Sequence, residues 1–352
     1  LGDDETFTAL SELGAFCLLL AAGVELEARD MLSASKRSML IAVCGMLVPL
    51  AVGAGLGLMV LPESPQRPAQ VLFLGTALAI TAVPVAIKVL MDLGQLDSEI
   101  GHTIVAAAVA DDILSLLLLA VLTGMLGNGG VPDLAAIAMI AAKAIGFVVL
   151  VALLLRVNSP RVDSLIELLA VEERGFVALL MVGFVLAVLA EALGLHFILG
   201  AFAAGLLFSR RAVSRERFER VKSKVDALAH GFLGPIFFVS IGFHLDLSAL
   251  AATPGFVAVL VLAAFLGKIL GAGGAALANG FERRAALAIG VSMSARGVVE
   301  LIVASVAAKA GLFEVPQPPP PIVANLFSAI VIMAIVTSMA VPPVLRATLG
   351  RR

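Results

Sequence analysis

The stretch AVADDILSLLLLAVL, residues 108–122, places two adjacent aspartates, Asp111 and Asp112, inside an otherwise apolar segment. The whole chain has the same character, because 61% of its 352 residues are hydrophobic and only 14% are charged, with a mean hydropathy of +1.08. Soluble domains carry about 25% charged residues. The sequence therefore predicts an all-α polytopic membrane protein, in which these two carboxylates lie within a membrane-spanning helix.

Apolar segments long enough to cross a bilayer recur along the chain. A span needs about 20 apolar residues, and eleven segments are predicted on that basis: 9–27, 38–61, 70–91, 100–126, 134–156, 174–192, 195–209, 231–246, 254–279, 284–311 and 322–348. Of the 24 Lys and Arg residues, 18 fall in alternate loops or at the end of the sequence, whereas the opposite loops hold Arg67 alone. The side rich in positive charge is expected to be cytoplasmic, so the sequence starts outside and ends inside a bacterial plasma membrane.

The stretch 210–230 interrupts this series of spans. Phe218, Val221, Val225 and Leu228 recur at helical spacing among seven basic residues. That pattern is typical of an amphipathic helix at a membrane surface. We therefore expect this stretch to lie on the inner surface as a linker between two halves and not to form a span.

The depth of the two aspartates indicates a function. Asp111 and Asp112 lie about 11 residues into segment 100–126, which is roughly 16 Å along a helix and close to the bilayer midplane. A charge at that depth is unfavourable unless it is paired or hydrated, so it is functional by default. Lys268 lies near the centre of segment 254–279 at the same depth. Two acids and one base leave one negative charge, which a monovalent cation or a proton could neutralise.

Two spans carry interruptions near their middles. Thr81 and Pro84 interrupt segment 70–91, and Pro84 lacks the N–H that a continuous helix needs. Ser294 and Arg296 interrupt segment 284–311 beside a glycine. By the loop charges, the second to fourth spans and the ninth to eleventh spans have opposite topology, as an inverted repeat requires. Broken helices at matching places in two halves indicate the central site of a secondary transporter.

Six motifs together resemble a known family. They read ITAVPVAIKVL (80–90), AAAVADDIL (106–114), AEALGLHFILGAFAAGLL (190–207), GPIFFVSIGFHLDL (234–247), KILGAGGA (268–275) and SARGVVELIVA (294–304). In this order they resemble the sodium/hydrogen exchanger-type membrane domain of the monovalent cation:proton antiporters, a group that includes bacterial Na⁺/H⁺ antiporters and the Kef-type and plant-type exchangers.

That resemblance covers nearly all of residues 1–352 and implies an organisation. It implies two broken, crossing helices and a core that moves like an elevator against a scaffold, usually in a homodimer. One or two further N-terminal helices are expected before Leu1. The expected ranges are 38–126 and 254–348 for the core, and 1–37 and 134–246 for the scaffold.

The resemblance also implies roles for individual residues. Asp112 resembles the carboxylate that binds the cation and the proton, with Asp111 beside it as the carboxylate that pairs with Lys268. Thr81 lies at the first break. The second-break motif contributes Ser294, Arg296 and Glu300. The Asp-Asp pair favours the sodium-type exchangers, whereas the form RGVVEL favours the plant-type branch. The identity of the transported cation therefore stays open.

Three classes of function stay open, and all three are transport. The favoured one is antiport of Na⁺, or of K⁺ or Li⁺, for H⁺, with a role in pH homeostasis. The alternatives are a symporter for an organic anion and a channel-like K⁺ efflux component. The sequence contains no phosphate loop, catalytic triad or metal-ligand cluster. We therefore expect no enzymatic activity, no cofactor and no nucleic-acid partner; the expected partners are the cation, the proton, the bilayer and a second copy of the chain.

Overall fold

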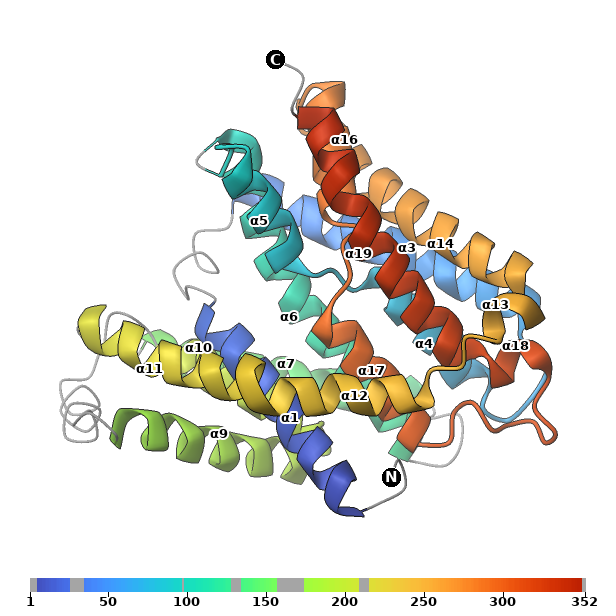
Figure 1. Cartoon of the computed structure of the whole chain (residues 1–352), viewed down its shortest axis with the longest axis horizontal. Coiled ribbons are helices and arrows are strands. Elements are labelled where there is room, and N and C mark those ends of the chain that lie inside the picture. Colours follow the sequence, from blue (N-terminus) through green and yellow to red (C-terminus); the bar gives the residue numbers. More distant parts are fainter. Residues whose placement is uncertain are drawn as a thin grey trace. The chain divides into compact units, whose positions relative to one another are not determined.

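The computed structural model describes residues 5–25, 35–96, 98–127, 134–156, 174–208 and 215–349 (Figure 1). Helices account for the regular structure in these ranges, and no strand occurs among them, so the predicted all-α class is confirmed. Each of the eleven predicted segments corresponds to a helix or to a consecutive pair of helices. By its internal contacts the chain divides into two compact units, Leu1–Leu32 with Leu134–His244 and Ser33–Asp133 with Leu245–Arg352.

The first unit is built around its N-terminal helix. Its elements are α1 (Glu5–Glu25), α7 (Leu134–Arg156), α9 (Arg174–Ala192), α10 (Phe197–Leu207), α11 (Arg215–Leu228), the π-turn η1 (Ala229–Leu233) and α12 (Gly234–His244). Helix α1 packs against α10, α11, η1 and α12. Gly23 of α1 lies against the backbone of Phe202 and Gly205 in α10. Small residues let two membrane helices approach closely, which explains the tight contact here.

One element of the first unit differs from the prediction. The amphipathic stretch was expected as a separate surface helix, but α11 continues through η1 into α12 without a break. Phe218, Val221 and Val225 are buried, because α11 packs against α1 and α9. The apolar stripe was therefore identified correctly, whereas its burial against protein was not expected.

The second unit contains both broken helices. Its elements are α3 (Lys36–Val60), α4 (Arg67–Ala79), α5 (Val83–Asp92), α6 (Glu99–Gly127), α13 (Ala249–Ala252), α14 (Pro254–Lys268), the π-turn η2 (Ile269–Gly273), α15 (Gly274–Ala278), α16 (Arg283–Ser292), α17 (Val298–Lys309), α18 (Pro321–Ala324) and α19 (Leu326–Leu349). The ranges expected for the core, 38–126 and 254–348, fall wholly within this unit.

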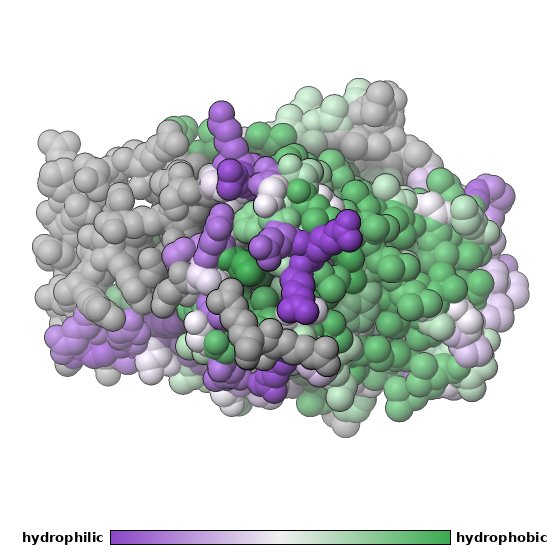
Figure 2. Space-filling view, turned by 90° about the horizontal axis from the view of Figure 1, so that it is seen from above, coloured by the Kyte–Doolittle hydropathy of each residue, from purple (hydrophilic) through white to green (hydrophobic). Residues whose placement is uncertain are grey.

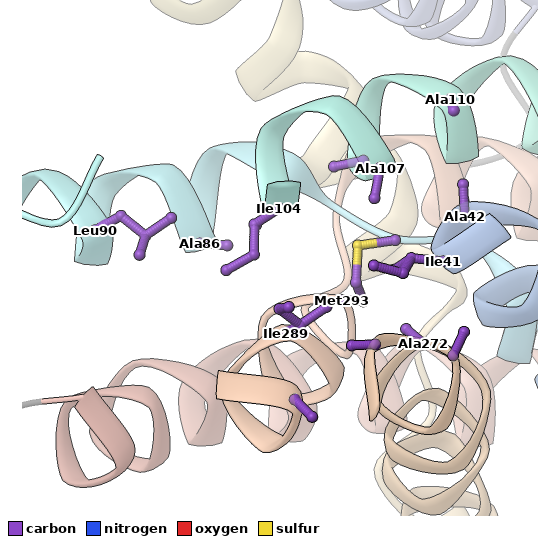
Figure 3. Packing of buried hydrophobic residues seen from close by; sticks show 14 residues of the cluster. Ile41, Ala42, Ala86, Leu90, Ile104, Ala107, Ala110, Ala272, Ile289 and Met293 are labelled. Carbon is purple, nitrogen blue, oxygen red and sulfur yellow. The ribbon is translucent and has the colours of Figure 1, made fainter. Parts of the chain in front are cut away.

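An alanine-rich cluster holds the second unit together around the break after α16 (Figure 3). Met293 projects into its middle, beside Ile41 and Ile104. Because alanine brings helix backbones close, the cluster fixes α6 against α3 and α16. Its buried members are Ile41, Ala42, Ala86, Leu90, Ile104, Ala107, Ala108, Ala110, Ala272, Ala275, Ala276, Ala286, Ile289 and Met293.

A buried glutamine joins the two broken helices far from their breaks. Gln70 of α4 donates from Nε2 to the carbonyl oxygens of Leu312 (2.9 Å) and Val315 (2.7 Å) in the loop after α17. These bonds hold the start of the proline-rich loop that follows α17.

The surface is that of a membrane protein. Seven described helices are long and apolar enough to cross a membrane, and two shorter apolar helices accompany them. Figure 2 shows hydrophobic side chains covering a broad area of one face. On α14 and the following η2, Leu262, Leu266 and Leu270 are 59%, 53% and 64% exposed. Exposed apolar area of this extent is rare on soluble monomers, so the chain is an integral, multi-pass membrane protein.

Two glycines of α3 allow a matched test of close helix contact. A Cβ at Gly53 would lie 2.7 Å from the Cα of Gly75 in α4, whereas a Cβ at Gly55 would meet nothing within 4 Å. Gly53→Ala and Gly55→Ala gain the same helix propensity, but only the first overpacks α3 against α4. Overpacking costs about 1–3 kcal/mol, so we expect Gly53→Ala to unfold at the lower temperature in detergent. Equal unfolding temperatures would show that α3 and α4 are not in the contact described.

Candidate functional site

The two helix breaks cross and are hydrogen-bonded to each other. Helix α4 ends at Ala79 and α5 begins at Val83, while α16 ends at Ser292 and α17 begins at Val298 (Figure 1). The N–H of Ala82 donates to the carbonyl of Ala295 (2.7 Å), and Thr81 Oγ1 donates to the carbonyl of Met293 (3.0 Å). The predicted crossing is therefore confirmed.

Arg296 of the second break donates hydrogen bonds to the backbone carbonyls at the end of the first half of the other broken helix. Its guanidinium donates from Nη1 to the carbonyls of Ala77 (3.0 Å) and Ile80, and from Nη2 to Leu78 (2.7 Å). The last carbonyls of a helix have no partners within the helix, and a cation is stabilising there. In a continuous helix the N–H of residue 84 would bond to Ile80, but proline has none. Arg296 supplies that missing donor.

Ser338 of α19 fixes the backbone of the second break. Its Oγ accepts from the N–H of Arg296 (3.2 Å) and donates to the carbonyl of the same residue (2.7 Å). Ser294 instead bonds within its own helical turn, donating from Oγ to the carbonyl of Gly290 (2.9 Å). Sequence reasoning missed Ser338, because a lone serine in an apolar span carries no signal and only the fold brings it to Arg296.

Asp111 and Lys268 form a fully buried ion pair. The Nζ atom of Lys268 lies 3.3 Å from both carboxylate oxygens of Asp111, and neither side chain is exposed. Asp111 comes from α6, whereas Lys268 is the last residue of α14, directly before η2. π-Turns inside α-helices are frequent at functional sites. The structure therefore brings together the acid and the base that the sequence placed at the same depth.

Asp112 differs sharply from its neighbour. It is partly exposed, and no hydrogen bond or ion pair links its side chain to another residue in the described ranges. Successive residues of a helix point about 100° apart, so Asp111 faces Lys268 while Asp112 does not. A partly accessible carboxylate with free oxygens can accept a proton or coordinate a cation.

A second pair of buried charges lies at the start of α17. Arg296 Nε is 3.8 Å from Glu300 Oε2, and both side chains are fully buried. With all five groups ionised, three acids (Asp111, Asp112, Glu300) and two bases (Lys268, Arg296) leave one negative charge. A single monovalent cation balances that charge.

The donor set suits a hard monovalent cation. Carboxylate, carbonyl and hydroxyl oxygens are the ligands for such ions, and unwound helix carbonyls serve this purpose in transporters. Asp112, Asp111 and Thr81 could supply them, since Thr81 Oγ1 keeps its lone pairs after donating to Met293. Among the residues that the structure describes, no group of three or more His, Cys, Asp or Glu side chains could hold a metal ion.

Known proteins are similar to this chain in sequence and in fold. A model of the family "Sodium/hydrogen exchanger, transmembrane" matches residues 1–347. The Na(+)/H(+)-K(+) antiporter GerN of Bacillus cereus is 31% identical over 350 residues, covering 99% of this chain and 85% of GerN. The high-affinity Na(+)/H(+) antiporter NhaS3 of Synechocystis is 34% identical over 350 residues, covering 97% and 71%. In fold, the chain matches the sodium proton antiporter MjNhaP1 of Methanocaldococcus jannaschii with a TM-score of 0.74 and 19% identity, over 98% and 84% of the chains.

The two bonds of Ser338 lead to a prediction about the second break. Ser338→Ala removes both bonds from the backbone of Arg296, and polar groups left unpaired in a protein interior cost about 1–3 kcal/mol. We expect a lower unfolding temperature in detergent and a higher cation concentration for half-maximal transport. Ser338→Thr retains the hydroxyl and is the control. If the Ala variant matches the Thr variant in both measurements, Ser338 does not fix the break.

Proposed function

We propose that this chain, which belongs to the sodium/hydrogen exchanger family, exchanges Na⁺ for H⁺ across a membrane, with K⁺ and Li⁺ as the other candidate cations. The observation that carries the proposal is Asp112, a partly exposed carboxylate beside the buried pair Asp111–Lys268. The relatives are named as antiporters of Na⁺, K⁺ and H⁺, which supports cation/proton antiport and a transporter without enzymatic chemistry.

Competition for one carboxylate couples the two fluxes. Asp112 is neutralised either by a proton or by a cation, and the surrounding charges balance to the same total in both cases. An uncompensated charge costs several kcal/mol in the hydrocarbon core. The site therefore reorients readily only when it is occupied, which prevents leak.

The organisation of the second unit suits an elevator-like movement. Both breaks, the aspartates and Lys268 belong to one compact unit, residues 33–133 with 245–352. A site contained in one unit can move as a whole while its ligands keep their geometry. We propose that this unit is the moving core, that residues 1–32 with 134–244 form the scaffold, and that the scaffold joins two copies in a homodimer. By its loop charges, we propose a bacterial plasma membrane with the C-terminal end in the cytoplasm.

Exchanging each aspartate for asparagine tests the assignment. Asp112→Asn keeps the shape but removes the charge and the titration, so we expect cation-driven proton movement in proteoliposomes to be abolished. Asp111→Asn should be milder, with weaker cation affinity, because Asp112 still titrates. The assay is run with Na⁺, K⁺ and Li⁺ in turn, on variants shown to be folded by gel filtration.

Each other outcome has a defined meaning. Normal exchange by Asp112→Asn with an inactive Asp111→Asn would reverse the two roles. Exchange by both variants would show that this site is not the antiport site. Cation movement without proton movement would favour a channel-like pathway, and a pH response driven only by an organic anion would favour a symporter.

Lys268 sets the charge of the empty site. Lys268→Gln removes the partner of Asp111 without removing Asp112, so we expect exchange to continue with a changed charge moved per cycle. The measurement is the transport current on a solid-supported membrane. Cation-driven proton movement in proteoliposomes is recorded in parallel. If current and pH dependence both match the wild type, Lys268 has only a structural role.

A further inference from the structure

Glu300 is a buried carboxyl whose hydrogen bonds are missing. It lies in the first turn of α17 with no exposed surface, and both its oxygens lack a hydrogen-bond partner among the described residues. Arg296 Nε, 3.8 Å from Glu300 Oε2, is likewise without a hydrogen bond there. The two groups attract each other electrostatically, but they are too far apart to satisfy each other's hydrogen bonds.

A third buried side chain, at the end of α4, has an oxygen without a hydrogen-bond partner. Thr76 lies in the last turn of α4, is fully buried, and its hydroxyl has no partner among the described residues. Other buried hydroxyls of this unit, such as those of Ser292 and Thr337, donate to a carbonyl one turn back. Arg296 bonds to the carbonyl of Ala77, the next residue after Thr76, and α4 contacts α17. Thr76 is therefore next in sequence to a residue that Arg296 contacts, on a helix that contacts the one carrying Glu300.

Water is the ligand that fits these atoms. Buried polar atoms are bonded in nearly all cases, and a buried water makes about three hydrogen bonds. One water can donate to the Glu300 carboxylate while it accepts from Arg296 Nε or from the Thr76 hydroxyl. A cation in this place would be repelled by Arg296, and an apolar ligand would leave all four atoms unsatisfied.

We propose that Thr76, Arg296 and Glu300 form a buried water-binding site, separate from Asp112, and that its water keeps Glu300 ionised. The inference rests on the proposed antiport. An ionised Glu300 balances Arg296, so that Asp111, Lys268 and Asp112 leave one net negative charge for the cation. With Glu300 neutral, the five groups would sum to zero and the cation would bind a site without net charge. Arg296 would then be a buried positive charge without its acidic partner, and it would oppose the binding of a cation nearby.

Removing one ligand of the water tests the site. Thr76→Val keeps the branched shape but removes the hydroxyl, whereas Thr76→Ser keeps the hydroxyl and is the matched control. We expect the cation concentration for half-maximal exchange to rise about tenfold in Thr76→Val, which corresponds to ~1.4 kcal/mol, and to stay at the wild-type value in Thr76→Ser. Glu300→Gln should raise it further. Unfolding temperatures of all three variants show that they are folded.

A high-resolution structure of the wild-type protein completes the test. We expect density for water within hydrogen-bonding distance of Glu300 and Thr76. Ordered water elsewhere in the protein but none at this site would overturn the proposal, as would wild-type cation dependence in both Thr76→Val and Glu300→Gln. Failure of the antiport proposal is recognised separately, because wild-type vesicles would then show no cation-driven proton movement, or the same movement as Asp112→Asn.

Discussion

The bonds from the Arg296 guanidinium to the end of α4 are the interaction on which the crossing of the two breaks, and with it the proposed ion site, depends. A helix that stops inside a membrane leaves carbonyls without partners, and no water is present in the hydrocarbon to satisfy them. Arg296 satisfies three of these carbonyls, and Ser338 fixes its backbone in turn. Because the two breaks stabilise each other, non-helical backbone can persist beside Thr81.

In the second unit, the close packing of the helices restricts where a charged side chain can lie without a partner. Gly53, Gly75 and the alanine cluster bring the helix backbones close together and make the surrounding interior apolar. In such an interior a charge must be paired, and Asp111 with Lys268 meets that condition. Asp112 does not, and it is partly exposed. The different environments of two adjacent residues therefore follow from the helix geometry of α6.

Hydrophobic length, loop charge and mid-span polar residues were sufficient to predict the helical segments, the breaks and a lysine at the depth of the two aspartates. The choice of Asp111 as the partner of that lysine came from the family resemblance. These signals are local or depend on composition, so they can be read without coordinates. Ser338 and Gln70 could not be identified, because each is an ordinary polar residue whose importance depends on a partner far away in the chain. The continuity of α11 with α12 was missed for a related reason: an apolar stripe predicts burial but does not say whether lipid or protein covers it. The π-turn after Lys268 follows from no pattern in the sequence.

Pro84 and Arg296 also bear on how the two halves of the molecule can change over evolutionary time. One half carries a residue that cannot donate a backbone hydrogen bond, and the other half carries the side chain that replaces the donor. Each residue is unfavourable by itself. An arginine without free carbonyls would leave buried guanidinium donors without hydrogen-bond partners, and a proline without the arginine would leave the carbonyl of Ile80 unsatisfied. The two positions are therefore expected to vary together among relatives. An inverted duplication that began with equivalent halves would become asymmetric at these two positions. It could not easily become symmetric again, because both residues would have to change together.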